Sequence, residues 1–309
     1  MQDDYTLGYA PDPHLFRCFF DSNRGLRKQN EDNYLYIRPD GKGGMAFFVD
    51  HETPVNKEVG TWPSGHVRMA VADGMGGHAH GREMAQAAVE YLREIPPIHN
   101  LEGMRKGLFR LHDRLRKDFH DQGDDSPGTT LLVADLSLKT SSGIMGHIGD
   151  SRAYEVHEGK EARQLTHDHT YEEFDWREGD IPREEYEQAL SRNQNELAQA
   201  LGYGSFGLMK EEDEYRPNRY DPRIRMDLAG DLPPVLVRHA DVFSFHLSHD
   251  KAILLATDGL WQPRQGKWSG PVTLNFLSRA EVVQQIQSAL DCGSTDNITA
   301  LIFGFGEAP

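Results

Sequence analysis

Four aspartates of this chain stand at the ends of apolar runs that have the composition of strands. They are Asp32, Asp73, Asp258 and Asp296, in the phrases Asn-Glu-Asp, Ala-Asp-Gly-Met-Gly-Gly, Thr-Asp-Gly and Thr-Asp-Asn. One Asp-Gly pair alone would indicate only a turn. Here two such pairs end strands, and glycine lets the backbone approach a ligand closely. Because Mg²⁺ and Mn²⁺ prefer oxygen ligands, the pattern predicts a metal centre built from carboxylates.

The composition is that of a folded, acidic protein. Of the 309 residues 38% are hydrophobic and 9% aromatic, which supports a sizeable core. The formal net charge of −16 argues against nucleic acid or an anionic membrane as a partner, because their phosphates would repel it. No apolar run approaches the length that spans a bilayer, and the acidic start Met1–Asp4 is unlike a signal peptide. We therefore expect a cytoplasmic protein. As a separate expectation, the protein is a monomer.

Hydrophobic periodicity predicts a layered α+β fold. Strands are expected over residues 15–21, 34–37, 45–49, 67–72, 129–138, 144–149, 153–156, 251–257 and 298–305, and helices over 81–94, 101–119 and 280–290. Residues 50–66 are polar and contain two prolines, which indicates a loop or a hairpin. The three strands within 129–156 lie close together along the chain, as expected of an antiparallel meander. Strands gathered around two central helices favour layers of sheet and helix.

Short phrases along nearly the whole chain resemble, in the same order, those of the PPM (protein phosphatase 2C) family of metal-dependent Ser/Thr phosphatases, in its bacterial form. The phrases are Gly25-Leu26-Arg27-Lys28-Gln29-Asn30-Glu31-Asp32, Val71 to Gly77, Gly128-Thr129-Thr130, Gly149-Asp150-Ser151-Arg152, Leu165-Thr166-His167-Asp168-His169, Ala200-Leu201-Gly202, Thr257-Asp258-Gly259 and Asp296-Asn297. Gly-Thr-Thr or Ala-Leu-Gly alone would carry no information, but the set together is highly specific.

The resemblance implies a fold and a division of the chain. The fold is a central β-sandwich of two antiparallel sheets flanked by helices, four layers in all, with the metal site at one end. Residues 1–13 would be an N-terminal leader and 14–307 a single phosphatase domain. Within it, residues of about 170–200 would form a flap beside the cleft, although their charge pattern is also that of any solvated helix. Residues of about 203–246 would be an insertion, either a partner surface or a plain surface excursion.

The resemblance also implies a role for each site residue. Hydrolysis of a phosphate monoester needs a strong nucleophile and neutralisation of developing charge, and two metal ions supply both. Asp73 would bridge two Mn²⁺ or Mg²⁺ ions, the Gly74 carbonyl would bind the first, and Asp258 and Asp296 the second. Asp32 and, mostly through water, Glu31 would complete the site. Arg27 would clamp the phosphate with its guanidinium fork, so that Arg27, Asp32 and Asp73 form the catalytic set.

Asp150 has two open interpretations. In the family, the aspartate of Gly-Asp-Ser-Arg contributes to a third, weaker metal site. A second contributor often stands where this chain has Gln262, whose amide brings no charge, so the third site would be weaker or completed from elsewhere. Alternatively, Asp150 forms a salt bridge with Arg152 or caps the turn.

Several histidines call for a separate interpretation. This chain has Met75 where some family members carry a histidine after Asp-Gly, so the general acid is undetermined, with His78 and His80 as weak candidates. His167-Asp168-His169 looks like a zinc phrase in isolation. No Cys or further His stands at a matching spacing, which favours structural hydrogen bonding.

The function implied by the resemblance is hydrolysis of phosphoserine and phosphothreonine in proteins. The partner would be a phosphorylated protein, the product of a Ser/Thr kinase in signal transduction. One alternative keeps the metal centre and assigns a non-protein phosphoester, since the site recognises the phosphate more than the leaving group. Another is an inactive phosphate-binding scaffold, which is disfavoured because the four aspartates are all present.

Overall fold

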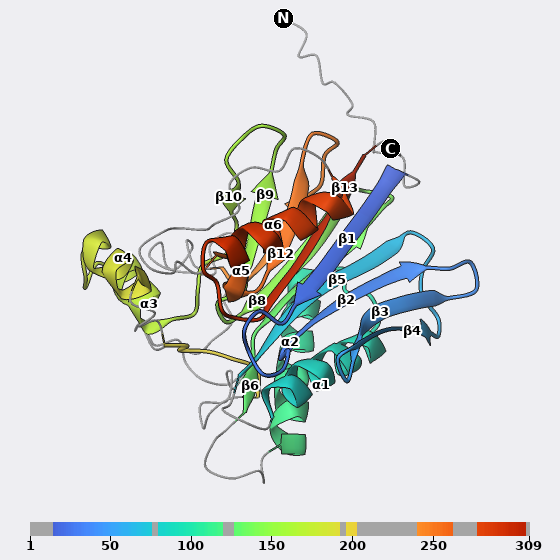
Figure 1. The fold of residues 1–309 in the computed structure, drawn as a ribbon. Coiled ribbons are helices and arrows are strands. Elements are labelled where there is room, and N and C mark those ends of the chain that lie inside the picture. The colour runs from blue at the N-terminus through green and yellow to red at the C-terminus, as the bar shows by residue number, and fades with distance from the viewer. Residues whose placement is uncertain are drawn as a thin grey trace, which may run out of the picture.

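Two antiparallel sheets pack face to face and carry helices on their outer faces (Figure 1). The computed structural model describes residues 15–75, 80–119, 127–191, 196–202, 240–261 and 277–306. The expected class, an α+β fold with a β-sandwich flanked by helices, is confirmed. In the described ranges no helix combines the length and the apolar character needed to cross a membrane.

Each sheet is built from strands that are distant in the sequence. The first sheet has the order β1 (Phe16–Asn23), β13 (Ile298–Phe305), β12 (Ala252–Ala256), β9 (Arg152–Val156) and β10 (Arg163–Gln164). The second has the order β11 (Val242–His246), β8 (Ser142–Ile148), β7 (Leu131–Ser137), β5 (His66–Met75), β2 (Asp32–Pro39), β3 (Gly44–Asp50) and β4 (Thr53–Val59), and β6 (Gly128–Thr129) pairs with the end of β5. The first and last strands of the chain, β1 and β13, are therefore neighbours.

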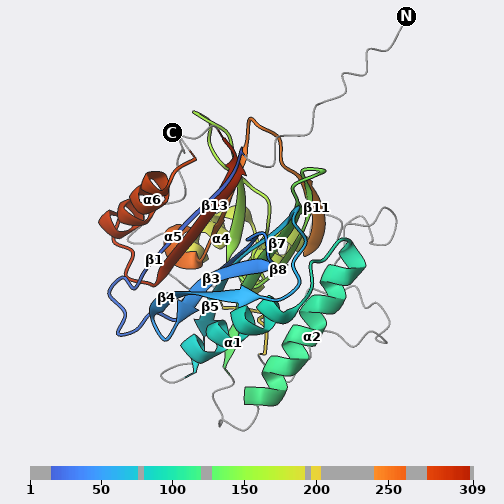
Figure 2. The same cartoon turned by 90° about the vertical axis from the view of Figure 1, so that its right-hand side faces the viewer.

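The four layers follow from how side chains alternate along the central strands. In β5, Val67, Met69 and Val71 point into the core between the sheets, whereas Ala70 and Ala72 face the helices. Such a strand is buried on both faces, which explains its continuous apolar character. Helices α1 (Gly81–Glu94) and α2 (Leu101–Phe119) cover the second sheet, and α6 (Arg279–Asp291) covers the first (Figure 2).

The predicted meander is wrong in its last strand. β7 and β8 pair as expected, but β9 leaves them and joins β12 in the other sheet. The chain makes this change at Gly149. Its φ of 105° is one that residues other than glycine rarely adopt. Asp150 consequently lies at the crossing between the two sheets. Within residues 50–66 the chain forms β4, so the hairpin interpretation of that segment is confirmed.

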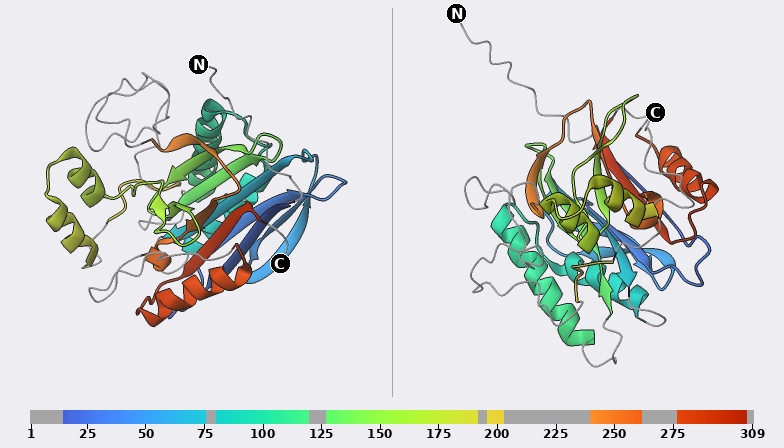
Figure 3. Two further views of the ribbon diagram at one scale, coloured as in Figure 1. Left: turned by 90° about the horizontal axis from the view of Figure 1, so that it is seen from above. Right: turned by 90° about the vertical axis from the view of Figure 1, so that its left-hand side faces the viewer.

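The segment predicted to be the flap forms two short helices beside the sandwich. These are α3 (Tyr171–Glu178) and α4 (Arg183–Ser191), which lie at one side of the sandwich (Figure 3). Tyr186 and Leu190 of α4 belong to the hydrophobic cluster of the first sheet. Thr170 caps α3 by accepting a hydrogen bond from the Glu173 amide. Stacked rings of Trp176 and Tyr186, 4.7 Å apart, hold the two helices together. The predicted leader 1–13 and residues 203–239 of the predicted insertion lie outside the described residues.

Candidate metal centre

The predicted aspartates meet at one end of the sandwich. Asp32 at the start of β2 is the register partner of Asp73 near the end of β5. Oδ2 of Asp32 accepts a hydrogen bond of 2.8 Å from Oγ1 of Thr257, which follows β12 in the other sheet. Thr257 is followed at once by Asp258, the first residue of the short helix α5 (Asp258–Trp261). Side chains from both sheets therefore converge here.

The Asp73-Gly74 turn is held by close backbone contacts. A Cβ at Gly74 would lie 1.9 Å from the carbonyl oxygen of Gly81, at the start of α1, so only glycine fits. The Gly74 amide donates to the Glu31 carbonyl at 3.2 Å. Thr130 holds Asp73 from the other side, because its amide donates to the Asp73 carbonyl and its Oγ1 accepts from the Asp73 amide. The phrase Gly-Thr-Thr, uninformative by itself, thus positions the central carboxylate.

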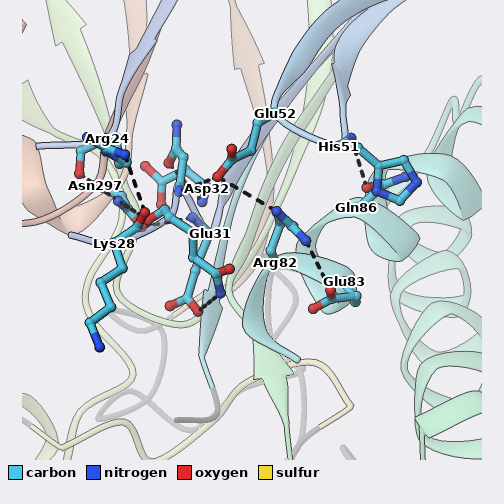
Figure 4. A network of polar contacts seen from close by, with 12 residues as sticks. Arg24, Lys28, Glu31, Asp32, His51, Glu52, Arg82, Glu83, Gln86 and Asn297 are labelled. Atoms are coloured by element: carbon cyan, nitrogen blue, oxygen red, sulfur yellow. Dashed lines mark hydrogen bonds and ion pairs between the residues drawn. The ribbon is translucent and has the colours of Figure 1, made fainter. Parts of the chain in front are cut away.

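Asn297 anchors the loop that carries Arg27 and Glu31 (Figure 4). Its Oδ1 accepts from the Glu31 amide at 2.8 Å, and its Nδ2 donates to the carbonyls of Arg24 and Gln29. The same network continues outward, where Glu52 accepts from the Asn30 amide and pairs with Arg82 of α1. The sequence pattern shows Asn297 only as the residue that follows Asp296 and does not predict this anchoring role.

Arg27 lies at the rim of the aspartate cluster. Its Nη2 is 2.6 Å from Oδ2 of Asp296, and 54% of its side chain is exposed. Partial burial would lower the pKa of Arg27, but the carboxylates of Asp296, Asp258 and Asp73 outweigh it and raise that pKa. The guanidinium therefore faces the cluster on one side and solvent on the other, a position from which it can meet an incoming anion.

The electrostatics show how tightly the carboxylates are gathered. Burial, together with the charges of Asp258 and Asp296, raises the pKa of Asp32 to about 8, although hydrogen bonds from threonines oppose the shift. Burial raises the pKa of Asp73 well above its usual range, and the carboxylates of Asp32, Asp258, Asp150 and Asp296 add to the effect. Five acidic groups therefore act on one another in a buried place, an arrangement that favours bound cations.

The donor set fits hard divalent ions. Oδ1 of Asp32 is buried and accepts no hydrogen bond from any residue that the structure describes. A buried carboxylate oxygen without a donor is costly unless a cation or a water satisfies it. The other groups of the cluster are carboxylates, oxygen ligands of the kind that Mg²⁺ and Mn²⁺ take. The residues present therefore fit the metals that the sequence predicts.

Asp150 belongs to this cluster. It is 6% exposed, and burial raises its pKa well above the usual range, with further contributions from Asp258 and Asp168. Arg152 forms a bidentate ion pair with Asp168, at 2.8 and 2.6 Å, and stacks on the ring of Trp261. The strong ion pair of Arg152 is thus with Asp168, and Asp150 interacts electrostatically with Asp258 and Asp73.

The remaining candidates are placed as follows. The Glu31 side chain is partly buried and accepts a hydrogen bond of 2.9 Å from Nε2 of Gln29. His80 directly precedes α1 and makes no capping hydrogen bond with its side chain. Gln262 and His78 lie outside the described residues. Neither a third metal site completed by Gln262 nor a general acid among these histidines therefore gains support from the structure.

A carboxylate cluster with an arginine at its rim, at one end of a two-sheet sandwich, suits a protein that handles phosphate with divalent cations. The family model of protein phosphatase 2C matches residues 57–291. The chain therefore belongs to the protein phosphatase 2C family.

Individual proteins show the same relationship. The chain is 25% identical over 252 residues to protein phosphatase PhpP of Streptococcus pneumoniae, which covers 79% of this chain and 88% of that protein. The structure resembles that of the serine/threonine phosphatase PstP/Ppp of Mycobacterium tuberculosis, with a TM-score of 0.61, 23% identity, and coverage of 94% of this chain and 99% of the other. It also resembles the catalytic domain of PstP in complex with two manganese ions, with a TM-score of 0.58, 22% identity, and coverage of 94% and 97%.

Proposed function

We propose that this protein hydrolyses phosphoserine and phosphothreonine in other proteins, with two Mn²⁺ or Mg²⁺ ions held by the aspartate cluster. The observation that carries the proposal is the convergence of five mutually interacting carboxylates from both sheets beside Arg27. Membership of the family and the manganese complex of PstP support it. When bound, such ions acidify a water molecule and neutralise charge on the phosphate.

The residues would divide the work by position. Asp73 interacts with Asp32, Asp150, Asp258 and Asp296, and it would be the ligand that two ions share. The Gly74 carbonyl and Asp32 would complete one side, and Asp258 and Asp296 the other. Glu31, at the edge, would act mainly through water. Asp150 would contribute to a weaker third site.

Arg27 would bind and orient the phosphate. A guanidinium presents two parallel N–H donors, which match two oxygens of a phosphate group. In the structure its Nη2 donates to Oδ2 of Asp296, so the fork is held at the rim of the cluster before any substrate arrives. The approach of a phosphate would draw the guanidinium from this carboxylate toward the substrate.

The substrates would be proteins phosphorylated by a Ser/Thr kinase. PhpP and PstP are named as phosphatases, PstP as a serine/threonine phosphatase, and we extend that specificity to this chain. We further propose that the protein works in the cytoplasm, in signal transduction, as a monomer. The cluster itself recognises phosphate and metal, so the choice of protein substrate would depend on surfaces around it.

The test measures hydrolysis of a phosphothreonine peptide and of p-nitrophenyl phosphate with Mn²⁺, with EDTA, and for the variant Asp73→Asn. Activity that needs Mn²⁺ and is lost in the variant supports the proposal. The variant Asp250→Asn removes an exposed carboxylate outside the cluster and should match the parent protein. Turnover of p-nitrophenyl phosphate without any phosphopeptide turnover would favour a non-protein phosphoester. A folded protein with no turnover in any divalent metal would favour a binding scaffold.

A further inference from the structure

A buried network of hydrogen bonds ends at Gly149, the residue before Asp150 of the aspartate cluster. Asp241, His169 and the Gly149 turn form it, and the side chains of Asp241 and His169 are completely buried. Oδ1 of Asp241 lies 2.7 Å from Nε2 of His169. The Gly149 amide donates to Nδ1 of the same ring at 3.1 Å. His169 thus joins a carboxylate on one side to the backbone just before Asp150 on the other.

The backbone donor fixes the protonation of the ring. An amide N–H can only donate, so Nδ1 of His169 must offer its lone pair. A neutral imidazole then carries its proton on Nε2, which donates to Asp241. His167, His169 and Asp241 also lie close enough together to suggest a cation site. However, a ring whose Nδ1 accepts a hydrogen bond cannot bind a metal through Nε2 without losing its last proton, which favours the hydrogen-bond network.

The network holds the Gly149 turn at both of its polar groups. The His169 amide donates to the Gly149 carbonyl at 2.9 Å, while the ring accepts from the Gly149 amide. A Cβ at Gly149 would lie 2.6 Å from Cγ2 of Thr130, the residue that holds Asp73 by its backbone. The turn is therefore held between His169 and Thr130. This fixes the direction in which the backbone continues from Gly149 to Asp150.

We propose that Asp241 and His169 are positioning residues for Asp150. The carboxylate of Asp241 orients the ring of His169, the ring fixes the Gly149 turn, and the turn aims Asp150 at Asp258 and Asp73. This inference rests on the metal centre of the proposed function, and its test measures metal binding rather than activity. Asp241 is itself held in place, because its carbonyl accepts from the His147 amide of β8 at 2.9 Å.

Two substitutions of His169 separate the role of the ring from simple packing. In His169→Asn the side-chain oxygen takes the place of Nδ1 and still accepts from the Gly149 amide. In His169→Gln the amide nitrogen takes the place of Nε2, so the contact with Asp241 remains and the acceptor for Gly149 is lost. We expect the glutamine variant to weaken the weakest Mn²⁺ site about 10-fold in calorimetric titrations, and the asparagine variant to stay within about 3-fold of the parent.

Asp241→Leu tests the other end of the hydrogen-bond network. Leucine has no oxygen to accept the Nε2 proton, so the ring of His169 loses the partner that orients it. The same weakening of Mn²⁺ binding as in His169→Gln is expected. The matched control is His66→Asn, since His66 is a buried histidine near a buried aspartate, Asp135, at the opposite end of β5. This control should leave Mn²⁺ binding unchanged.

A double-mutant cycle decides whether the effect passes through Asp150. If it does, His169→Gln should change Mn²⁺ binding by less than about 2-fold in an Asp150→Asn background. Equal losses in the glutamine and asparagine variants, additive with Asp150→Asn, would overturn the proposal and leave a packing role. The calorimetric readout stands even if no phosphatase activity is found. Failure of the proposed function would appear as a parent protein that binds Mn²⁺ but does not turn over phosphopeptide.

Discussion

Asp32 and Asp73 face each other directly across β2 and β5, as register partners on neighbouring antiparallel strands. Like charges in such a position repel each other and destabilise a sheet. The chain nevertheless buries Asp32, half-buries Asp73 and adds Asp258 and Asp296 to the same place. A folded protein tolerates this arrangement because protons or cations neutralise the carboxylates.

Asp73→Asn should remove activity and yet not harm the fold. Without metal, the substitution relieves repulsion among five carboxylates, so the free energy of unfolding in EDTA at pH 8 should stay equal or rise. Activity should fall by about 10³-fold, because a shared ligand is lost. Thermal melts in EDTA and in Mn²⁺ provide the measurement. A variant that melts earlier than the parent in EDTA would contradict the account of a repulsive cluster.

Thr257→Val should weaken metal binding, and it should also destabilise the fold because the buried Thr299 amide loses its acceptor. The hydroxyl of Thr257 donates to Asp32 at 2.8 Å and accepts from the Thr299 amide at 2.9 Å. Partners that orient a ligating carboxylate are worth about 10- to 100-fold in affinity or activity. We expect the concentration of Mn²⁺ for half-maximal activity to rise by that factor. Thr257→Ser keeps the hydroxyl and should restore the parent value; if serine behaves like valine, the hydrogen bond is not the cause.

Arg27→Ala should weaken the binding of substrate more than that of metal. The guanidinium is the cation at the rim of the cluster, and loss of a charged hydrogen-bonding partner of phosphate should raise KM about 10- to 100-fold. Arg27→Lys should recover only part of this, because an ammonium lacks the planar fork. Steady-state kinetics with a phosphothreonine peptide test the prediction.

Arg24 offers a matched control for that experiment. Its side chain makes an exposed hydrogen bond to the Lys28 carbonyl within the same loop. Arg24→Ala therefore also removes one positive charge, three residues from Arg27, but leaves the Arg27 guanidinium at the cluster. Kinetics of this variant should stay close to the parent, and an equal rise in KM would indicate a general charge effect.

Arg152→Met should be severely destabilising. The ion pair between Arg152 and Asp168 is almost completely buried, with exposures of 2% and 0%. Removing the arginine leaves a buried carboxylate without its cation, at a cost of about 3–5 kcal/mol in urea denaturation. The double variant Arg152→Met/Asp168→Leu should recover much of the lost free energy of unfolding. By contrast, Arg183→Ala breaks an exposed pair with Glu187 and should cost less than about 0.5 kcal/mol.

Acid should destabilise the protein through its buried histidines. Burial lowers the pKa of His66 to about 4, and burial with the charge of Arg116 lowers that of His112 to about 4. An unfolded histidine titrates near 6.5, so between pH 6.5 and 4 the unfolded chain binds more protons than the folded one. Stability from these groups is present above pH 6.5 and is lost as the pH falls through this window.

His112→Asn measures this dependence for one group. An asparagine oxygen can still accept the hydrogen bond of 3.0 Å that the Gly202 amide gives to Nδ1 of His112, but it does not titrate. The free energy of unfolding should depend less steeply on pH between pH 6.5 and 4.5 than in the parent. The decrease in slope should correspond to about one bound proton. An unchanged slope would show that His112 does not remain neutral in the folded protein.

The sequence predicted the elements that have a strong local pattern. The apolar positions of residues 81–94 and 101–119 gave both helices their observed bounds, because one buried face recurs every three to four residues. Strand partners were harder to predict. Nothing in residues 142–156 shows that β9 leaves β8 for the other sheet, since closeness along the chain does not say which sheet a strand joins.

Within the site, the residues were easier to predict than their supports. The four aspartates could be predicted because each stands at the end of an apolar run and two are followed by glycine. They are Asp32, Asp73, Asp258 and Asp296. The hydrogen bond of Thr257 to Asp32 spans 225 positions, and that of His169 to Asp241 spans 72. Such pairs leave no local periodicity, and only the folded chain brings them together.

The proposed metal ligands come from both sheets, and this has a consequence for the lifetime of the folded protein. Asp32 and Asp73 belong to one sheet, whereas Asp258 and Asp296 border strands of the other. Cations held by both sets would cross-link the open end of the sandwich with a strength that depends on their free concentration. Chelation should then loosen hydrogen exchange in β5 and β12 together and speed proteolysis, so that the supply of metal would govern how long the folded chain persists.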